Sequence, residues 1–197
     1  MFQFNVKGCR LKIHFSLFAL IAFLNLVSGV KNGMWMFAVI LMHEGAHLMA
    51  MLVTANPPDG IMLSALGMRI ILPKGQQLSY GENVIISLAG PVMNFICALS
   101  FAVAGLNEVS YMSLAMGIFH ILPVEPLDGG FALHAFLSAY RGEDKAEKIL
   151  SAVSLMFILP IIVLGFFVLV NTKYNFTLLL TAMYLMVYLV MKRSKFI

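Results

Sequence analysis

Long apolar stretches alternate with short polar breaks along the whole chain. Crossing about 30 Å of hydrocarbon takes roughly 20 helical residues, and six stretches approach that length. The breaks hold Gly, Pro, Asn and charged residues, which favour turns. The pattern predicts an all-α polytopic membrane protein in which residues 1–197 form a single domain. Its six predicted spans are Ile13–Val30, Gly33–Val53, Asn83–Gly105, Val109–Leu127, Ile149–Val170 and Asn175–Met191.

The segment between the second and third predicted spans follows a different pattern. Residues 54–82 are too polar and too often interrupted to cross a membrane. Within them, residues 61–72 are apolar and partly β-branched, with glycines nearby. Non-helical backbone is tolerated at membrane depth only where protein or water covers it. We therefore expect a short β-hairpin or a membrane-dipping segment here.

Composition supports a membrane protein and excludes several other classes. Hydrophobic residues make up 61% of the chain and charged residues 11%, whereas soluble domains average about 45–50% and about 25%. Two cysteines in 197 residues do not make a disulfide-rich secreted module. No basic cluster with interleaved aromatic residues is present, so nucleic acid is not an expected partner and the lipid bilayer is.

The basic residues predict the orientation in the membrane. Six spans place both termini on one side, together with the segment 54–82 and the connection between the fourth and fifth spans. Of the 13 Lys and Arg residues, only Lys31 and Lys173 fall on the opposite side. Cytoplasmic loops carry the excess of Lys and Arg, so both termini are predicted to be cytoplasmic.

The second predicted span contains the pattern His43-Glu44-Gly45-Ala46-His47. Residues four apart lie on one face of a helix, so the two imidazoles can bind one Zn²⁺ while Glu44 acts as a general base toward water. The alternative is a pair of buried histidines that only form hydrogen bonds to neighbouring helices. That alternative leaves the intramembrane Glu44 unexplained, and such groups are costly in an apolar span.

A catalytic zinc site needs a third protein ligand, and the end of the fourth predicted span offers Asp128. Pro123 and Pro126 break a helix there, and two glycines after Asp128 permit a tight turn. The second and fourth spans run in the same direction, so Asp128 is expected at a depth similar to that of the histidines. The alternative is an ordinary aspartate in a turn at the membrane interface.

Three motifs together resemble the site-2 protease family of intramembrane zinc metalloproteases. They are His43-Glu44-Gly45-Ala46-His47, Gly90-Pro91-Val92-Met93-Asn94 and Leu127-Asp128-Gly129-Gly130. The chain is most similar to the sporulation branch, that of stage IV sporulation protein FB. Because the sequence stops at Ile197, we expect it to lack the cytoplasmic CBS domain of many of those relatives.

The resemblance implies roles for individual residues. His43, His47 and Asp128 match the zinc ligands, and Glu44 matches the catalytic base. Asn94 matches an asparagine associated with substrate or oxyanion binding, although an amide in an apolar helix is equally a helix–helix hydrogen bond.

Two residues near Asp128 depart from the family pattern. His120 stands where many members have asparagine, and with Asn94 it is a candidate for substrate or oxyanion binding. It could line the cavity, support a ligand or compete weakly as one. Glu125 is expected to be hydrated at the mouth of the cavity.

The sequence thus predicts an intramembrane zinc metalloendopeptidase. The resemblance implies that it cleaves a membrane-tethered regulatory precursor at the cytoplasmic side, for the sporulation branch a sigma-factor precursor, and that membrane inhibitors or regulators act on it. The alternative is an intramembrane metal-binding transporter or channel. A transporter does not need a base next to a histidine pair, and its polar residues would recur along several spans.

Overall fold

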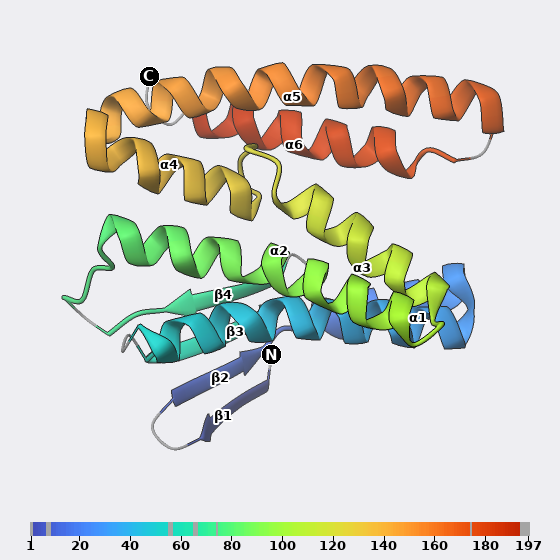
Figure 1. Ribbon diagram of the computed structural model, residues 1–197, viewed down its shortest axis with the longest axis horizontal. Coiled ribbons are helices and arrows are strands. Elements are labelled where there is room, and N and C mark those ends of the chain that lie inside the picture. The colour runs from blue at the N-terminus through green and yellow to red at the C-terminus, as the bar shows by residue number, and fades with distance from the viewer. Residues whose placement is uncertain are drawn as a thin grey trace. The chain divides into compact units, whose positions relative to one another are not determined.

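A computed structural model of the chain divides into two compact units, Met1–Gly117 and Ile118–Ile197. The structure describes residues 2–6, 9–54, 57–64, 67–73, 75–173 and 175–193. Helices dominate both units, as the hydrophobic pattern predicts (Figure 1). Each unit is described below by itself.

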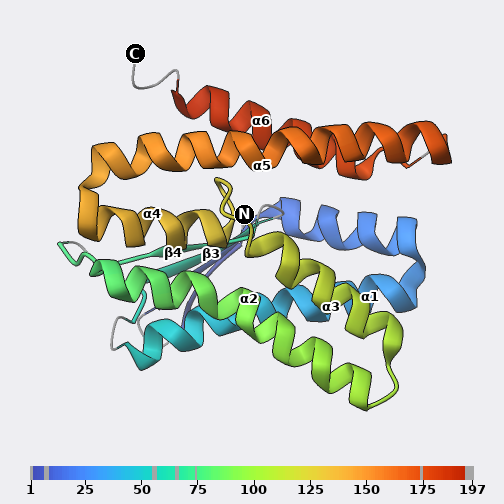
Figure 2. The same ribbon diagram turned by 45° about the horizontal axis from the view of Figure 1, so that its top comes forward.

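The first unit begins with a helix that folds back on itself, α1 (Phe15–Val53). Gly29 has φ 76° and ψ 155°, which breaks the helix, and this positive φ suits glycine because it has no Cβ. After the break, Gly33 packs so closely that a Cβ there would lie 2.8 Å from the backbone of Asn25. Figure 2 shows the two segments of α1 running back along each other. The first two predicted helices are therefore present, with the break at Gly29 instead of residues 31–32.

A four-stranded sheet also belongs to the first unit. Its order is β1 (Phe2–Val6), β2 (Cys9–Ile13), β3 (Gly60–Ser64) and β4 (Gly67–Ile71). The β3–β4 pair is antiparallel, so the predicted β-hairpin is confirmed. β2 and β3 pair in parallel, and α1 is the segment of chain that connects them. Side chains of Arg10 and Asp59 form an ion pair where β2 meets the start of β3.

The first unit continues with α2 (Tyr80–Val103) and with α3 (Asn107–His120), whose residues 118–120 belong to the second unit. Ser79 and Glu82 form a capping box that starts α2 by satisfying backbone N–H groups of its first turn. The second segment of α1 lies beside α2 in Figures 1 and 2. Buried apolar side chains fill the space, among them Val39 and Met51 of α1 and Ile86 of α2.

The second unit contains α4 (Asp128–Arg141), α5 (Glu143–Thr172) and α6 (Thr177–Arg193). The fourth predicted span is shorter than expected, because α3 ends at His120 and residues 121–127 are not helical. Two prolines in that segment explain the early end. The segment still belongs to the core, since Val124 and Leu127 pack with Ile158, Leu185 and Leu189 of α5 and α6.

The helices suit a membrane environment. Within the described residues, α1, α2 and α5 are long and apolar enough to cross a bilayer, and α6 is apolar but shorter. α5 leaves large apolar side chains such as Val163, Phe166 and Phe167 more than half exposed. A helix that is apolar all round lies inside a large core or in lipid. The full count of six spans remains a prediction.

Candidate metal centre

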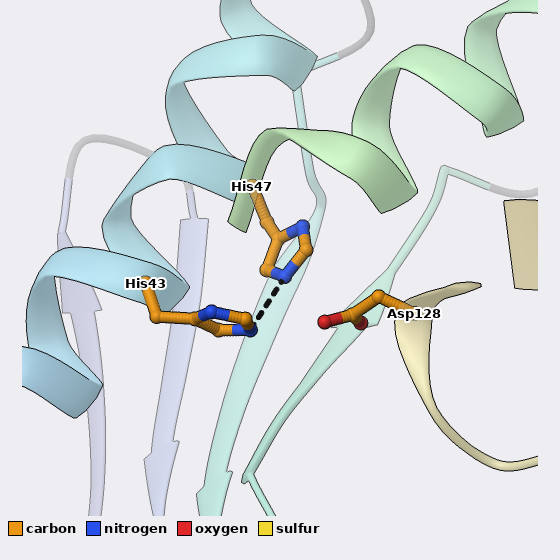
Figure 3. A group of neighbouring side chains, drawn as sticks. All are labelled: His43, His47 and Asp128. Atoms are coloured by element: carbon orange, nitrogen blue, oxygen red, sulfur yellow. Dashed lines mark hydrogen bonds between the residues drawn. The ribbon is translucent and has the colours of Figure 1, made fainter. Parts of the chain in front are cut away.

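His43 and His47 lie on one buried face of α1, as their spacing predicts. Their side chains are 1% and 8% exposed. The ring centroids are 4.8 Å apart with planes at 80°, and the two Nε2 atoms are 3.2 Å apart (Figure 3). The two histidines therefore present the same kind of ring nitrogen toward one point.

α2 holds both imidazoles by their other nitrogens. His47 Nδ1 lies 2.6 Å from the carbonyl oxygen of Ile86, and His43 Nδ1 lies 3.1 Å from Asn94 Nδ2. A carbonyl that accepts from the ring, as at His47 Nδ1, fixes the orientation of a metal-binding histidine. At His43 the amide of Asn94 contacts the corresponding nitrogen, so α2 meets both rings on the side opposite Nε2.

Gly90, between Ile86 and Asn94 on the same face of α2, makes room for the rings. A Cβ at residue 90 would lie 2.7 Å from His43 Nε2 and closer still to His47 Nε2. A side chain larger than hydrogen would displace one or both imidazoles. Gly90, at the start of the predicted Gly-Pro-x-x-Asn motif, is thus part of the site.

Glu44 follows His43 on α1 and is half-buried. Successive residues are about 100° apart around a helix, so the carboxylate leaves α1 beside the histidine face and not on it. This position suits a group that acts next to a metal without binding it.

Asp128 is the first residue of α4, in the second unit, and its side chain also appears in Figure 3. Its Oδ2 accepts a hydrogen bond from His120 Nδ1 at 2.8 Å. The following glycines allow the preceding segment to fold tightly over the helix start, because a Cβ at Gly130 would lie 2.5 Å from the carbonyl oxygen of Val124. Asp128 offers a carboxylate oxygen as a donor atom, and His120 is its neighbour within the same unit.

Glu125 is buried, and not hydrated as expected from the sequence. The sequence suggested a hydrated carboxylate, but the residue is 4% exposed and its Oε1 accepts a hydrogen bond from Lys192 Nζ at 2.7 Å. Lys192 also lies 3.0 Å from Glu147 Oε1 of α5. The Glu125 N–H donates to the buried hydroxyl of Ser154. The apolar pattern gave no sign of this pairing, because its members are far apart in sequence.

The donor types fit zinc. Each histidine offers a ring nitrogen and Asp128 offers a carboxylate oxygen, and these are the ligand atoms of catalytic zinc sites. The close packing of both rings against Gly90 and the carbonyl contact at His47 Nδ1 agree with that use of the histidines.

Comparison with known proteins finds a solved structure with a similar fold. No protein-family model matches the chain. The chain is similar to the solved structure of a site-2 protease from Methanocaldococcus jannaschii, with a TM-score of 0.66 and 20% identity. The match covers 93% of this chain and 91% of that one, so the two share a fold.

A curated protein is similar at the level of sequence. It is a zinc metalloprotease of Methanocaldococcus jannaschii, 24% identical over 168 residues. The match covers 74% of this chain and 48% of that protein, so the chain spans about half the length of the curated relative.

Proposed function

We propose that the chain is an intramembrane zinc metalloendopeptidase. The observation that carries the proposal is the buried histidine pair of α1, whose Nε2 atoms face each other while α2 holds both Nδ1 atoms. Glu44 stands next to this pair in the sequence. The similarity to a zinc metalloprotease and to the fold of a site-2 protease supports the same activity.

In this proposal, His43, His47 and Asp128 hold the zinc ion. When bound, zinc polarises the scissile carbonyl and makes water acidic enough to attack near neutral pH. Glu44 takes a proton from the attacking water and delivers it to the leaving amine. His120 orients Asp128 by donating a hydrogen bond to its Oδ2 atom.

The proposed substrate is a membrane-tethered regulatory protein, cut near the cytoplasmic face. The resemblance to the sporulation branch favours a sigma-factor precursor, with membrane inhibitors or regulators as further partners. Both termini are proposed to be cytoplasmic, in a multi-pass arrangement of six spans.

The competing function is an intramembrane metal transporter or channel. Both functions use the histidines and Asp128, but only the protease needs a base beside them. The role of Glu44 therefore separates the two.

Substitution of Glu44 by Gln tests the protease directly. The amide cannot accept a proton from water, so we expect cleavage to fall by about 10²–10⁴-fold while bound zinc stays at the wild-type level. New protein termini in membranes of cells that express each variant are the measurement. Fragments should appear with the wild-type protein and be absent with Glu44→Gln.

The control is Glu108→Gln, which changes an exposed glutamate in the first turn of α3 and should leave the fragments unchanged. Identical fragments from the wild-type protein and Glu44→Gln would contradict the protease mechanism.

A further inference from the structure

Asn94 is a fully buried polar residue of α2. It is 0% exposed, and its amide nitrogen lies 3.1 Å from His43 Nδ1. On its other side α3 approaches closely, since a Cβ at Gly117 would lie 3.2 Å from the Asn94 Cβ. The side chain is thus enclosed between α1 and α3, at the ring nitrogen opposite the one that faces His47.

The hydrogen position on His47 follows from its partner. The carbonyl oxygen of Ile86 can only accept, so His47 Nδ1 carries the hydrogen and donates it. In a neutral imidazole the other nitrogen then keeps its lone pair. His47 Nε2 is ready to bind a metal.

The Asn94 contact gives the opposite arrangement for His43. With the amide placed so that Nδ2 lies 3.1 Å from His43 Nδ1, Nδ1 accepts from it, and a neutral His43 ring then carries its hydrogen on Nε2, 3.2 Å from His47 Nε2. In this form His43 Nε2 has no lone pair for a metal. Within the described residues, Asn94 Oδ1 has no hydrogen-bond partner.

Binding through His43 Nε2 requires the hydrogen to be on Nδ1, and the group opposite must then be an acceptor. A half-turn of the Asn94 carboxamide exchanges Nδ2 for Oδ1 and supplies one. We propose that Asn94 is a positioning residue for His43: its amide turns so that Oδ1 accepts the Nδ1 hydrogen and holds the ring in its metal-binding form. This inference rests on the proposed function and assigns Asn94 a role other than binding substrate or an oxyanion.

The face of α2 explains why one helix serves both histidines. Ile86, Gly90 and Asn94 follow one another at intervals of four residues, as His43 and His47 do on α1. A fixed carbonyl holds one ring, a glycine leaves space for both, and an amide that can either donate or accept holds the other. Only His43 can therefore change its hydrogen position between the metal-free and metal-bound forms.

Two substitutions of Asn94 distinguish the positioning of His43 from the binding of substrate or an oxyanion. Asn94→Leu keeps the approximate shape but removes the acceptor, so zinc affinity measured by competition with a chelator should fall about 10–100-fold. Asn94→Asp keeps an acceptor and should bind zinc far more tightly than Asn94→Leu. Ser113→Ala is the control, because it removes a fully buried hydroxyl of α3 that lacks a partner within the described residues, and it should bind zinc like the wild type.

The other possible outcomes separate the positioning role of Asn94 from the proposed function of the protein. Wild-type affinity in Asn94→Leu, or equal losses in both Asn94 variants, would overturn the positioning role and leave the proposed function standing. Unchanged zinc affinity in Asn94→Leu together with lost cleavage in both variants would support oxyanion binding instead. A wild-type protein without zinc affinity would contradict the proposed function itself.

The wild-type protein provides a test that needs no variant. Nitrogen-15 NMR of labelled imidazoles distinguishes a ring nitrogen that carries hydrogen from one that does not. We expect His43 to carry hydrogen on Nε2 without metal and on Nδ1 with zinc, while His47 carries it on Nδ1 in both states. Hydrogen on His43 Nδ1 in both states would overturn the proposed turn of the amide.

Discussion

Gly90 is the residue at which size alone is expected to control metal binding. A methyl group there would overlap both histidine Nε2 atoms, so Gly90→Ala should push the rings apart. We expect the zinc affinity to fall by at least about tenfold, which is the lower end of the loss seen when groups that support metal ligands are changed. Chelator competition measures this.

Gly81→Ala is the matched control for that substitution. It lies in the first turn of α2, and a Cβ there would meet nothing within 4 Å. Equal zinc affinities in Gly90→Ala and Gly81→Ala would contradict the assigned geometry.

At this scale the sequence predicted that the two histidines share a helix face, but it did not predict which residues contact them. His43 and His47 lie on one face because helical spacing alone requires it. The contacts from Ile86, Gly90 and Asn94 depend on how α1 and α2 pack, which no local pattern contains. Glu125 was wrongly expected to be hydrated, since its partner Lys192 is 67 residues away.

At the scale of elements, the segment before Asp128 depends on α5 and α6. Lys192 of α6 bonds to the buried Glu125, and Lys192→Met would leave that carboxylate without a partner on Oε1. An unsatisfied buried polar group costs roughly 1–3 kcal/mol, so the free energy of unfolding should fall by about that amount. Denaturant titration of the purified protein in detergent measures the loss.

Lys148→Met is the control, because Lys148 is exposed on the neighbouring α5. Adding Glu125→Gln to Lys192→Met should recover part of the stability, since the buried negative charge is then gone. A Lys192→Met protein as stable as Lys148→Met would show that the ion pair contributes nothing.

The strand β1 and the helix α4 were not predicted from the sequence, and each omission has an identifiable reason. β1 alternates Phe2, Phe4 and Val6 with polar residues, a strand signal that the long apolar stretches overshadowed. α4 begins with Asp128 and two glycines, which were interpreted only as a turn. Its glycines are needed there because the preceding segment packs against them, and that contact outweighs their low helix propensity.

For the whole molecule, the distribution of Lys and Arg predicts which side each loop faces. In a variant without its own cysteines (Cys9→Ser, Cys97→Ser), Lys31→Cys should react with a membrane-impermeant thiol reagent in intact cells. Gln77→Cys and Lys145→Cys, also at exposed positions, should react only after the cells are made permeable. The reverse pattern would invert the proposed orientation and place Asp128 near the other face.

The zinc content of the purified protein tests the central claim most directly. The account predicts about one zinc per chain for the wild type and for Asp144→Ala, whose aspartate is exposed at the start of α5. It predicts a clear loss for Asp128→Ala, because two histidines alone make an incomplete site. A wild-type protein purified in the presence of zinc but without bound metal, or an Asp128→Ala protein with the full amount, would contradict it.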